Sequence, residues 1–284
     1  RIKILSRDIP KLIILGSAAA EGLPAFFCGC QVCTDARKVG GKEIRNRTSY
    51  NFGGKLQIDF GPDIMQAFQR YEEVSRTRHV IITHAHEDHF APFELQYKAQ
   101  GFSQTPSSDV LTLYGTDAVY NRLAGVRKGM SGAETSPEIL AGIGLAFREI
   151  RPFEPFDIPS IGAHIVPLRA NHDPRSNPVI YIATMDGRSV LIGNDTGVFP
   201  QETRDFLASM PPVRLDVAIL DDCACLWPWR DGHMGGESVI EMFDFLQSLG
   251  FVTERTAKVV NHFSHNPNMS HVRLEEFWFP KGIL

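Results

Sequence analysis

Four side chains that can bind a metal ion stand within six positions of this chain: His84, His86, Asp88 and His89. They directly follow residues 79–83, a short apolar segment of the kind that forms a buried strand. A strand that ends in such a loop directs several imidazoles and a carboxylate into one cleft. Neutral imidazole and carboxylate suit zinc, manganese or iron. The segment therefore predicts a metal site, the alternative being a histidine-rich surface loop.

Short apolar segments bounded by turn residues recur along the chain and predict strands at residues 11–15, 55–60, 79–83, 110–114, 163–168, 179–184, 189–193, 217–220 and 258–261. Helical spacing of apolar residues predicts helices at residues 64–75, 93–100, 201–210 and 237–249. Residues 122–141 are rich in Gly and Ser, so we expect a surface loop or lid there. The mixture indicates an α/β protein, and since no linker separates two parts, we expect one domain over residues 1–284.

The composition narrows the classes of partner. With 29 Lys and Arg against 33 Asp and Glu and a net charge of −4, the chain lacks the basic character that attracts nucleic acid. At 43% hydrophobic residues, it can bury a sizeable core. No apolar segment approaches the ~20 residues of a membrane helix, and residues 1–15 lack the apolar core of a secretory signal. We expect a cytoplasmic protein without a membrane partner.

Five cysteines are an odd number, and Cys28, Cys30 and Cys33 are too closely spaced to close three separate disulfides. Metal ligation and reduced thiols are the two interpretations open at this point. Three thiolates lack one ligand of a tetrahedral zinc site. His265 is a candidate for the fourth, and it stands three residues after His262.

The spacing His84-Ala-His86-Glu-Asp88-His89 resembles the HxHxDH motif of the metallo-β-lactamase superfamily of metal-dependent hydrolases. The resemblance implies an αββα sandwich, in which two mixed sheets pack face to face between helices. It also implies two divalent metals, Zn, Mn or Fe. His84, His86 and His172 would hold the first metal, Asp88, His89 and His262 the second, and Asp195 would bridge them. A hydrogen-bonded turn histidine at His172 and an Asx turn at Asp195 are the structural alternatives.

A second resemblance concerns the segment Gly22-Leu-Pro24-Ala-Phe-Phe-Cys28-Gly-Cys30-Gln-Val-Cys33, preceded by Leu15-Gly16-Ser17. Together with the later His262-Phe-Ser-His265, it resembles the PhnP-like branch, whose members are cyclic ribose phosphate phosphodiesterases. The resemblance implies a structural zinc held by Cys28, Cys30, Cys33 and His265. Buried, metal-free cysteines are the alternative.

The same branch carries a histidine that contacts the scissile phosphate, and His233 matches its position. The resemblance makes His233 a catalytic candidate that aids the leaving oxygen, and Asp88 a second one that orients the nucleophile. Asp59 follows a predicted strand, where we expect it to support the ligand loop without contacting a metal. Trp227 and Trp229 could line a substrate pocket. The family suggests no role for Cys223 and Cys225.

The resemblance favours a dinuclear-metal phosphodiesterase whose partner is a small phosphate ester, including a cyclic one, and a homodimer is compatible with the sequence. A lactonase or thioesterase of the same fold is one alternative. A non-catalytic zinc-binding accessory protein of quinone-cofactor biosynthesis is another, although the intact His84–His89 set argues against it. RNA 3′-end processing, as in tRNase Z, is disfavoured because no basic, Gly-rich arm is present.

Overall fold

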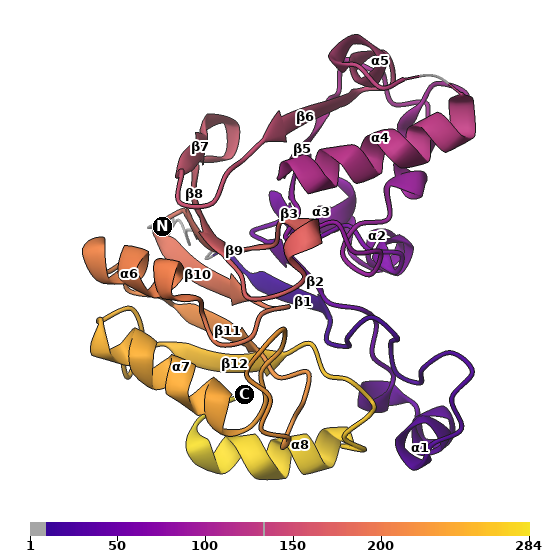
Figure 1. The fold of residues 1–284 in the computed structure, drawn as a ribbon. Helices are drawn as coiled ribbons and strands as arrows, with labels where there is room; N and C mark the ends of the chain where they lie inside the picture. The colour runs from indigo at the N-terminus through magenta and orange to yellow at the C-terminus, as the bar shows by residue number, and fades with distance from the viewer. Residues whose placement is uncertain (1–9, 133) are drawn as a thin grey trace, which may run out of the picture.

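Two six-stranded sheets pack face to face between outer helices in the computed structural model, which describes residues 10–132 and 134–284 (Figure 1). The first sheet has the order β1-β2-β3-β4-β5-β6. Its strands β3 to β6 run parallel to one another, whereas β2 is antiparallel to both β1 and β3. The bounds of these strands are β1 Leu12–Gly16, β2 Ser49–Phe52, β3 Leu56–Ile58, β4 His79–Ile81, β5 Leu111–Gly115 and β6 Leu145–Glu149.

The second sheet has the order β12-β11-β10-β9-β8-β7. Strands β10, β11 and β12 are parallel, and β7 to β10 form an antiparallel meander. The bounds are β7 Phe156–Ile158, β8 Ala163–Arg169, β9 Val179–Met185, β10 Arg188–Gly193, β11 Val217–Asp221 and β12 Ala257–Asn261. The predicted αββα sandwich is therefore confirmed.

Alternation along the strands divides the core into layers, because successive side chains of a strand point to opposite faces. On β9, Tyr181 joins the buried cluster between the sheets, while Ile180 and Ile182 join the cluster beneath the outer helices. On β4, Ile81 faces the opposite sheet and Val80 faces its own helices. Both faces of the central strands are buried, which explains why they are apolar throughout.

The helices cover the outer faces of the two sheets (Figure 1). α2, α4 and α5 lie over the first sheet, and α6, α7 and α8 lie over the second. The α-helices are α1 Gln31–Val39, α2 Ile64–Arg70, α3 Glu72–Ser75, α4 Asp117–Ser131, α5 Pro137–Gly142, α6 Gln201–Ser209, α7 Glu237–Ser248 and α8 His271–Trp278. Short 3₁₀ segments are η1 Gly41–Glu43, η2 Pro92–Lys98, η3 Pro159–Ile161, η4 Pro174–Ser176 and η5 Phe279–Lys281.

The prediction of a loop at residues 122–141 is wrong. Apart from residue 133, which lies outside the described part, the segment is mostly helical and belongs to α4 and α5. Val119 and Leu123, four positions apart on one face of α4, are fully buried against the first sheet. Gly125 and Gly129 lie on the helix with open space around them, so this packing outweighs their weak helix propensity.

Other sequence predictions differ in detail. Residues 64–75 form two helices that meet at Tyr71, and residues 93–100 largely form the 3₁₀ segment η2. The nine predicted strands are all present, whereas β2, β6 and β7 were not predicted. Of the amino-terminal stretch, residues 1–9 lie outside the described part. Within the described residues, no helix combines the length and apolar character needed to cross a membrane.

Candidate functional site

The chemically active side chains come from the carboxyl ends of strands in both sheets. Asp59 follows β3, and the segment that carries His84, His86, Asp88 and His89 follows β4. Strands β8, β10, β11 and β12 point the same way in their sheet. The residues that follow or end these four strands are His172, Asp195, Asp221 and His262. Residues that are far apart in sequence therefore meet at one edge of the sandwich.

Three histidines form the first group, with one ring nitrogen each within 4.8 Å of the others: His84, His86 and His172. The Nδ1 of His172 lies 3.0 Å from the carbonyl oxygen of Gly232, which can only accept, so Nδ1 carries the proton. This tautomer leaves the lone pair on Nε2, which lies 3.2 Å from His86 Nδ1. Burial lowers the pKa of His172 and holds that of His84 well below its usual value, so both rings are neutral.

A buried atom in this group lacks a hydrogen-bond partner. The Nε2 of His84 makes no hydrogen bond within the described part of the chain, although its side chain is only 1% exposed. Leaving a buried polar atom unsatisfied costs about 1–3 kcal/mol. A neutral imidazole with a free lone pair directed at two further histidines is the donor set that a divalent metal binds. These three residues therefore fit a metal ion.

The second group consists of Asp88, His89, Asp195 and His262, again within 4.8 Å of one another. His89 Nε2 lies 2.5 Å from Asp195 Oδ2 and 3.0 Å from Asp88 Oδ2. Burial opposes protonation of His89, but the carboxylates of Asp88, Asp195 and Asp59 raise its pKa well above the usual value. The same negative charge that favours a proton on His89 would favour a divalent cation between these carboxylates. Mixed imidazole and carboxylate ligands suit such an ion.

Asp195 belongs to the second group and also lies close to the first. Its Oδ1 is 3.0 Å from His262 Nε2 and its Oδ2 is 3.4 Å from His84 Nε2. Burial opposes ionisation, but His262 and His89 hold the pKa of Asp195 well below its usual value, so it is a carboxylate. Its backbone is left-handed, with φ of 51°. The carboxylate is placed where it can contact ions in both groups.

Asp59 supports the ligand loop from behind. Its Oδ2 lies 2.6 Å from His89 Nδ1, and its Oδ1 accepts a hydrogen bond from the backbone N–H of Thr83 at 2.8 Å. The carboxylate orients the His89 ring and leaves Nε2 directed at Asp88 and Asp195. This geometry agrees with the supporting position predicted for Asp59.

His233 enters the site from the loop after β11. Its Nδ1 lies 3.1 Å from Asp221 Oδ2 and 3.3 Å from Asp195 Oδ1. Burial opposes protonation, but Asp221 raises the pKa of His233 to about 12, so the ring is cationic. Asp221 also accepts hydrogen bonds from the backbone N–H groups of Asp195, Cys223 and Met234. Sequence reasoning missed Asp221, although its position at the end of a predicted strand was a usable signal.

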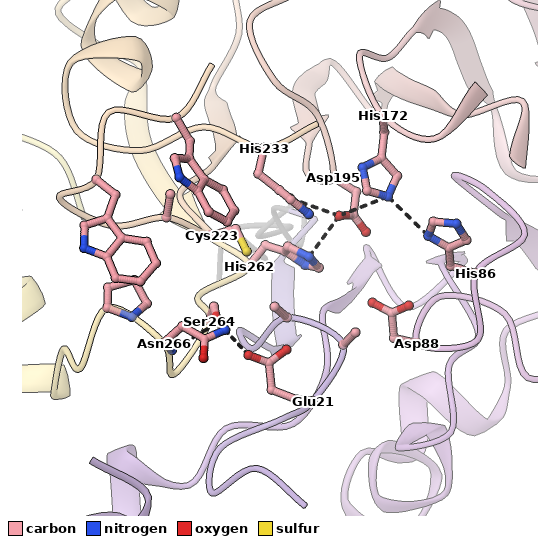
Figure 2. Close-up of a pocket in the computed structure, with 16 residues that line it drawn as sticks. Glu21, His86, Asp88, His172, Asp195, Cys223, His233, His262, Ser264 and Asn266 are labelled. Atoms are coloured by element: carbon pink, nitrogen blue, oxygen red, sulfur yellow. Dashed lines mark hydrogen bonds and ion pairs between the residues drawn. The ribbon is translucent and has the colours of Figure 1, made fainter. Parts of the chain in front are cut away.

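A cavity of about 280 Å³ opens onto both groups. Figure 2 shows His86, Asp88, His172, Asp195, His233 and His262 around a common space. Cys223 and both Trp227 and Trp229 line the cavity, as does Glu21. Cys225, by contrast, is fully buried in the core under the outer helices. The remaining lining residues are Ala19, Ala20, Ala224, Ser264, Asn266 and Pro267.

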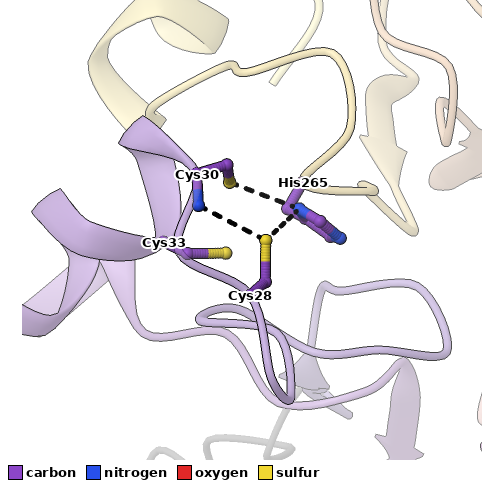
Figure 3. Close-up of side chains that lie close together, drawn as sticks. All are labelled: Cys28, Cys30, Cys33 and His265. Carbon is purple, nitrogen blue, oxygen red and sulfur yellow. Dashed lines mark hydrogen bonds between the residues drawn. The ribbon is translucent and has the colours of Figure 1, made fainter.

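A separate cluster, outside the two groups above, contains Cys28, Cys30, Cys33 and His265 (Figure 3). One sulfur or ring nitrogen of each residue lies within 4.8 Å of the others. The Nδ1 of His265 lies 3.5 Å from Cys30 Sγ and 3.7 Å from Cys28 Sγ. Burial opposes ionisation of Cys30, but hydrogen bonds from the Cys33 backbone and His265 lower its pKa to about 6. None of the five cysteines, all in the described part, forms a disulfide. Three thiols and one imidazole at this spacing fit a tetrahedral zinc.

The fold and the clustered histidines and aspartates define the class of protein. Residues 55–263 match the family model of the beta-lactamase superfamily domain, and the chain belongs to this family. It is a metallo-β-lactamase superfamily protein with candidate metal sites for hydrolytic chemistry.

Solved structures with this fold include a diphosphatase of the PhnP family, with a TM-score of 0.68 and 20% identity over 96% of this chain and 92% of that one. Zn²⁺-bound PqqB from Methylobacterium extorquens has a TM-score of 0.67 and 18% identity, over 97% and 96% of the two chains. Human tRNase Z, short form, has a TM-score of 0.57 and 16% identity, over 92% and 94%. Identities this low establish the fold alone.

Curated relatives match more weakly. Coenzyme PQQ synthesis protein B of Bradyrhizobium diazoefficiens is 26% identical over 126 residues, 40% of this chain and 41% of that protein. An octanoyltransferase of Porphyromonas gingivalis is 23% identical over 280 residues, 93% of this chain and 48% of that protein. The chain thus spans less than half the length of these relatives.

Proposed function

We propose that this protein is a phosphodiesterase that hydrolyses a small phosphate ester with two divalent metal ions. The observation that carries the proposal is the position of Asp195, whose two oxygens face His262 on one side and His84 on the other. In this assignment His84, His86 and His172 would hold one ion, Asp88, His89 and His262 would hold the other, and Asp195 would be a ligand of both. Cys28, Cys30, Cys33 and His265 hold a structural zinc.

Two bound divalent ions would supply an activated water nucleophile and Lewis-acid stabilisation of a phosphoryl oxygen. The chain's own groups supply the rest. Asp88 lines the cavity, where its carboxylate can accept a hydrogen bond from the attacking water. His233 is a cation at the cavity wall, and its N–H can donate to a phosphate oxygen or to the leaving oxygen. Asp221 holds the His233 ring in place.

Charge and size argue for a small substrate. The cavity of about 280 Å³ is suited to a small molecule, and no Lys or Arg stands among its lining residues. A protein that grips nucleic acid needs several cations along the phosphate backbone. RNA 3′-end processing is therefore disfavoured, in spite of the fold shared with tRNase Z.

A non-catalytic zinc-binding role is the second candidate, favoured by the similarity to PqqB in both fold and sequence. The two candidates differ in metal content. The phosphodiesterase requires about three metals per chain, two in the active site and one among the cysteines. The accessory role requires only the cysteine-bound zinc.

Elemental analysis of freshly purified protein, together with hydrolysis of bis(p-nitrophenyl) phosphate with Zn²⁺, Mn²⁺ or Fe²⁺, distinguishes the two. We expect about three metals per chain and metal-dependent turnover. His86→Ala should lose both turnover and about one metal, whereas His164→Gln, whose side chain is exposed on β8, should keep both. One zinc per chain and no turnover with any metal would overturn the proposal in favour of the accessory role.

A further inference from the structure

We propose that Trp227, Trp229 and Glu21 form a subsite that binds a neutral, planar, hydrogen-bond-donating group of the substrate and rejects a second phosphate. A nucleoside without a terminal phosphate is a group of this chemistry. The inference rests on the proposed phosphodiesterase function, because it names the part of the substrate beyond the scissile phosphate. It concerns the cavity wall beyond the candidate metal ligands.

The two tryptophans are exposed although their loop is well anchored. Trp227 is 41% exposed and Trp229 is 46% exposed, and their ring centroids lie 5.8 Å apart. The backbone N–H of Trp227 donates to the Ala224 carbonyl at 2.9 Å, and the Ser238 hydroxyl donates to the Trp229 carbonyl at 2.6 Å. Indole rings that are held open to solvent beside a cavity mark a binding surface. Planar rings stack on such faces in a way that tolerates different ring types.

Glu21 gives the same cavity a fixed acceptor. Its Oε1 accepts hydrogen bonds from the Ser264 hydroxyl at 2.6 Å and from the backbone N–H of His265 at 3.3 Å. Both donors belong to the segment that also carries His262, so the carboxylate is fixed relative to the metal site. Its Oε2 has no partner among the described residues and is free to accept from an N–H or O–H. Figure 2 shows Glu21 beside Ser264 and Asn266 in the cavity wall.

The charges of the residues that line the cavity determine which substrate groups the subsite excludes. Apart from the candidate metal ligands and His233, which is paired with Asp221, Glu21 is the charged residue that lines the cavity, and no Lys or Arg lines it to neutralise a second phosphate. Arg230, which lies next to the tryptophans in sequence, is engaged with Glu241 at 2.7 Å. A dianionic phosphate placed near Glu21 would meet like charge without a Lys or Arg to compensate it. A neutral group with N–H or O–H donors meets an acceptor instead.

Three p-nitrophenyl diesters with the same scissile bond test the subsite: thymidine 5′-(p-nitrophenyl phosphate), its 3′-phosphorylated derivative and methyl p-nitrophenyl phosphate. We expect kcat/KM for the thymidine ester to exceed that for the methyl ester at least tenfold, the scale of one base stacked on an aromatic side chain. The 3′-phosphate should lower kcat/KM at least tenfold. Equal values for the three esters would overturn the proposal.

Variants assign the effects to residues. The double variant Trp227→Ala/Trp229→Ala should reduce kcat/KM for the thymidine ester to the value for the methyl ester. Trp227→Phe/Trp229→Phe should retain most of the preference for the thymidine ester. Glu21→Gln should restore at least threefold of the loss caused by the 3′-phosphate. Phe279→Ala and Glu254→Gln alter exposed residues outside the cavity and serve as matched controls. Loss of activity toward all three esters in equal measure would contradict a binding role for these side chains.

A binding measurement separates this proposal from the phosphodiesterase proposal. Titration of the purified protein with thymidine should quench tryptophan fluorescence saturably, because two of the three tryptophans line the cavity and Trp278 is buried. The quenching should disappear in the double alanine variant. Saturable quenching without hydrolysis of any ester would sink the phosphodiesterase and keep the subsite. Hydrolysis of all three esters with no saturable quenching would do the reverse.

Discussion

His262 and His265 are three residues apart, yet their side chains face two different clusters. His262 Nε2 lies 3.0 Å from Asp195 Oδ1, and His265 Nδ1 lies 3.5 Å from Cys30 Sγ. His262 reaches its place through a left-handed backbone with φ of 69°. One short segment after β12 therefore joins the candidate active site to the cysteine cluster, and a disturbance of one should reach the other.

Cys30→Ser should remove one metal per chain, lower the melting temperature and reduce turnover. The loss of a thiolate would weaken the proposed zinc site, of which His265 is a ligand, and a shift of this segment would displace His262. Metal analysis, thermal unfolding and the bis(p-nitrophenyl) phosphate assay measure the three effects. Lys38→Ala, on the exposed face of α1, is the control. A variant that loses its metal yet keeps full turnover would show that the two clusters are independent.

Asp221→Asn should lower the pKa of His233. Burial opposes protonation of His233, but Asp221 raises this pKa to about 12, against about 6.5 in an unfolded chain. The pair therefore contributes its full stabilisation below pH 6.5 and loses it as the pH rises toward 12. NMR titration of the imidazole should show wild-type His233 protonated throughout pH 6–9, whereas it titrates in this range in the variant. Identical titration of the two proteins would contradict the assignment.

Asp222 gives a pH dependence of the same sign, which begins at lower pH. It is fully buried, and burial raises its pKa well above the usual value, while its Oδ2 accepts a hydrogen bond from Trp278 Nε1 at 2.8 Å. The folded protein retains a proton that the unfolded chain releases above pH ~4, so this residue's contribution falls as pH rises from there toward the folded pKa.

Asp222→Asn keeps an acceptor for Trp278 and removes this ionisation. Its stability relative to the wild type should rise between pH 5 and pH 8, as measured by urea unfolding. Asp222→Ala leaves Trp278 without its partner and should cost about 1–3 kcal/mol at pH 5. A constant difference between Asp222→Asn and the wild type across this range would show that Asp222 is ionised in the folded protein.

Gly129→Ala tests the helix found where the sequence predicted a loop. Gly129 lies in the exposed interior of α4 with nothing within 4 Å of an added Cβ. Alanine there should stabilise the fold by about 0.5–1 kcal/mol in chemical unfolding. Gly132→Ala, at the carboxyl-terminal cap with φ of 71°, should destabilise it instead. Equal effects of the two substitutions would argue against a helix that ends at Ser131.

Local pattern was enough for much of the fold and for the candidate metal ligands. Apolar strands such as β4 and β10 can be recognised in the sequence because burial on both faces makes them apolar throughout. His84, His86, Asp88 and His89 are recognisable because their spacing is short and immediately follows a strand. Their meeting with His172, Asp195 and His262 was predicted only through the family resemblance, and the structure brings these residues together.

Tertiary packing decided what lies beyond local pattern. α4 is a helix because Val119 and Leu123 are buried against the first sheet. The free energy of this packing outweighs the low helix propensity of the glycines in the segment. Asp221 reaches His233 across 12 positions, and Glu21 reaches Ser264 across 243. A single carboxylate in a sequence has many conceivable partners. Only the folded chain selects one, because side-chain pairing depends on distances in space rather than along the backbone.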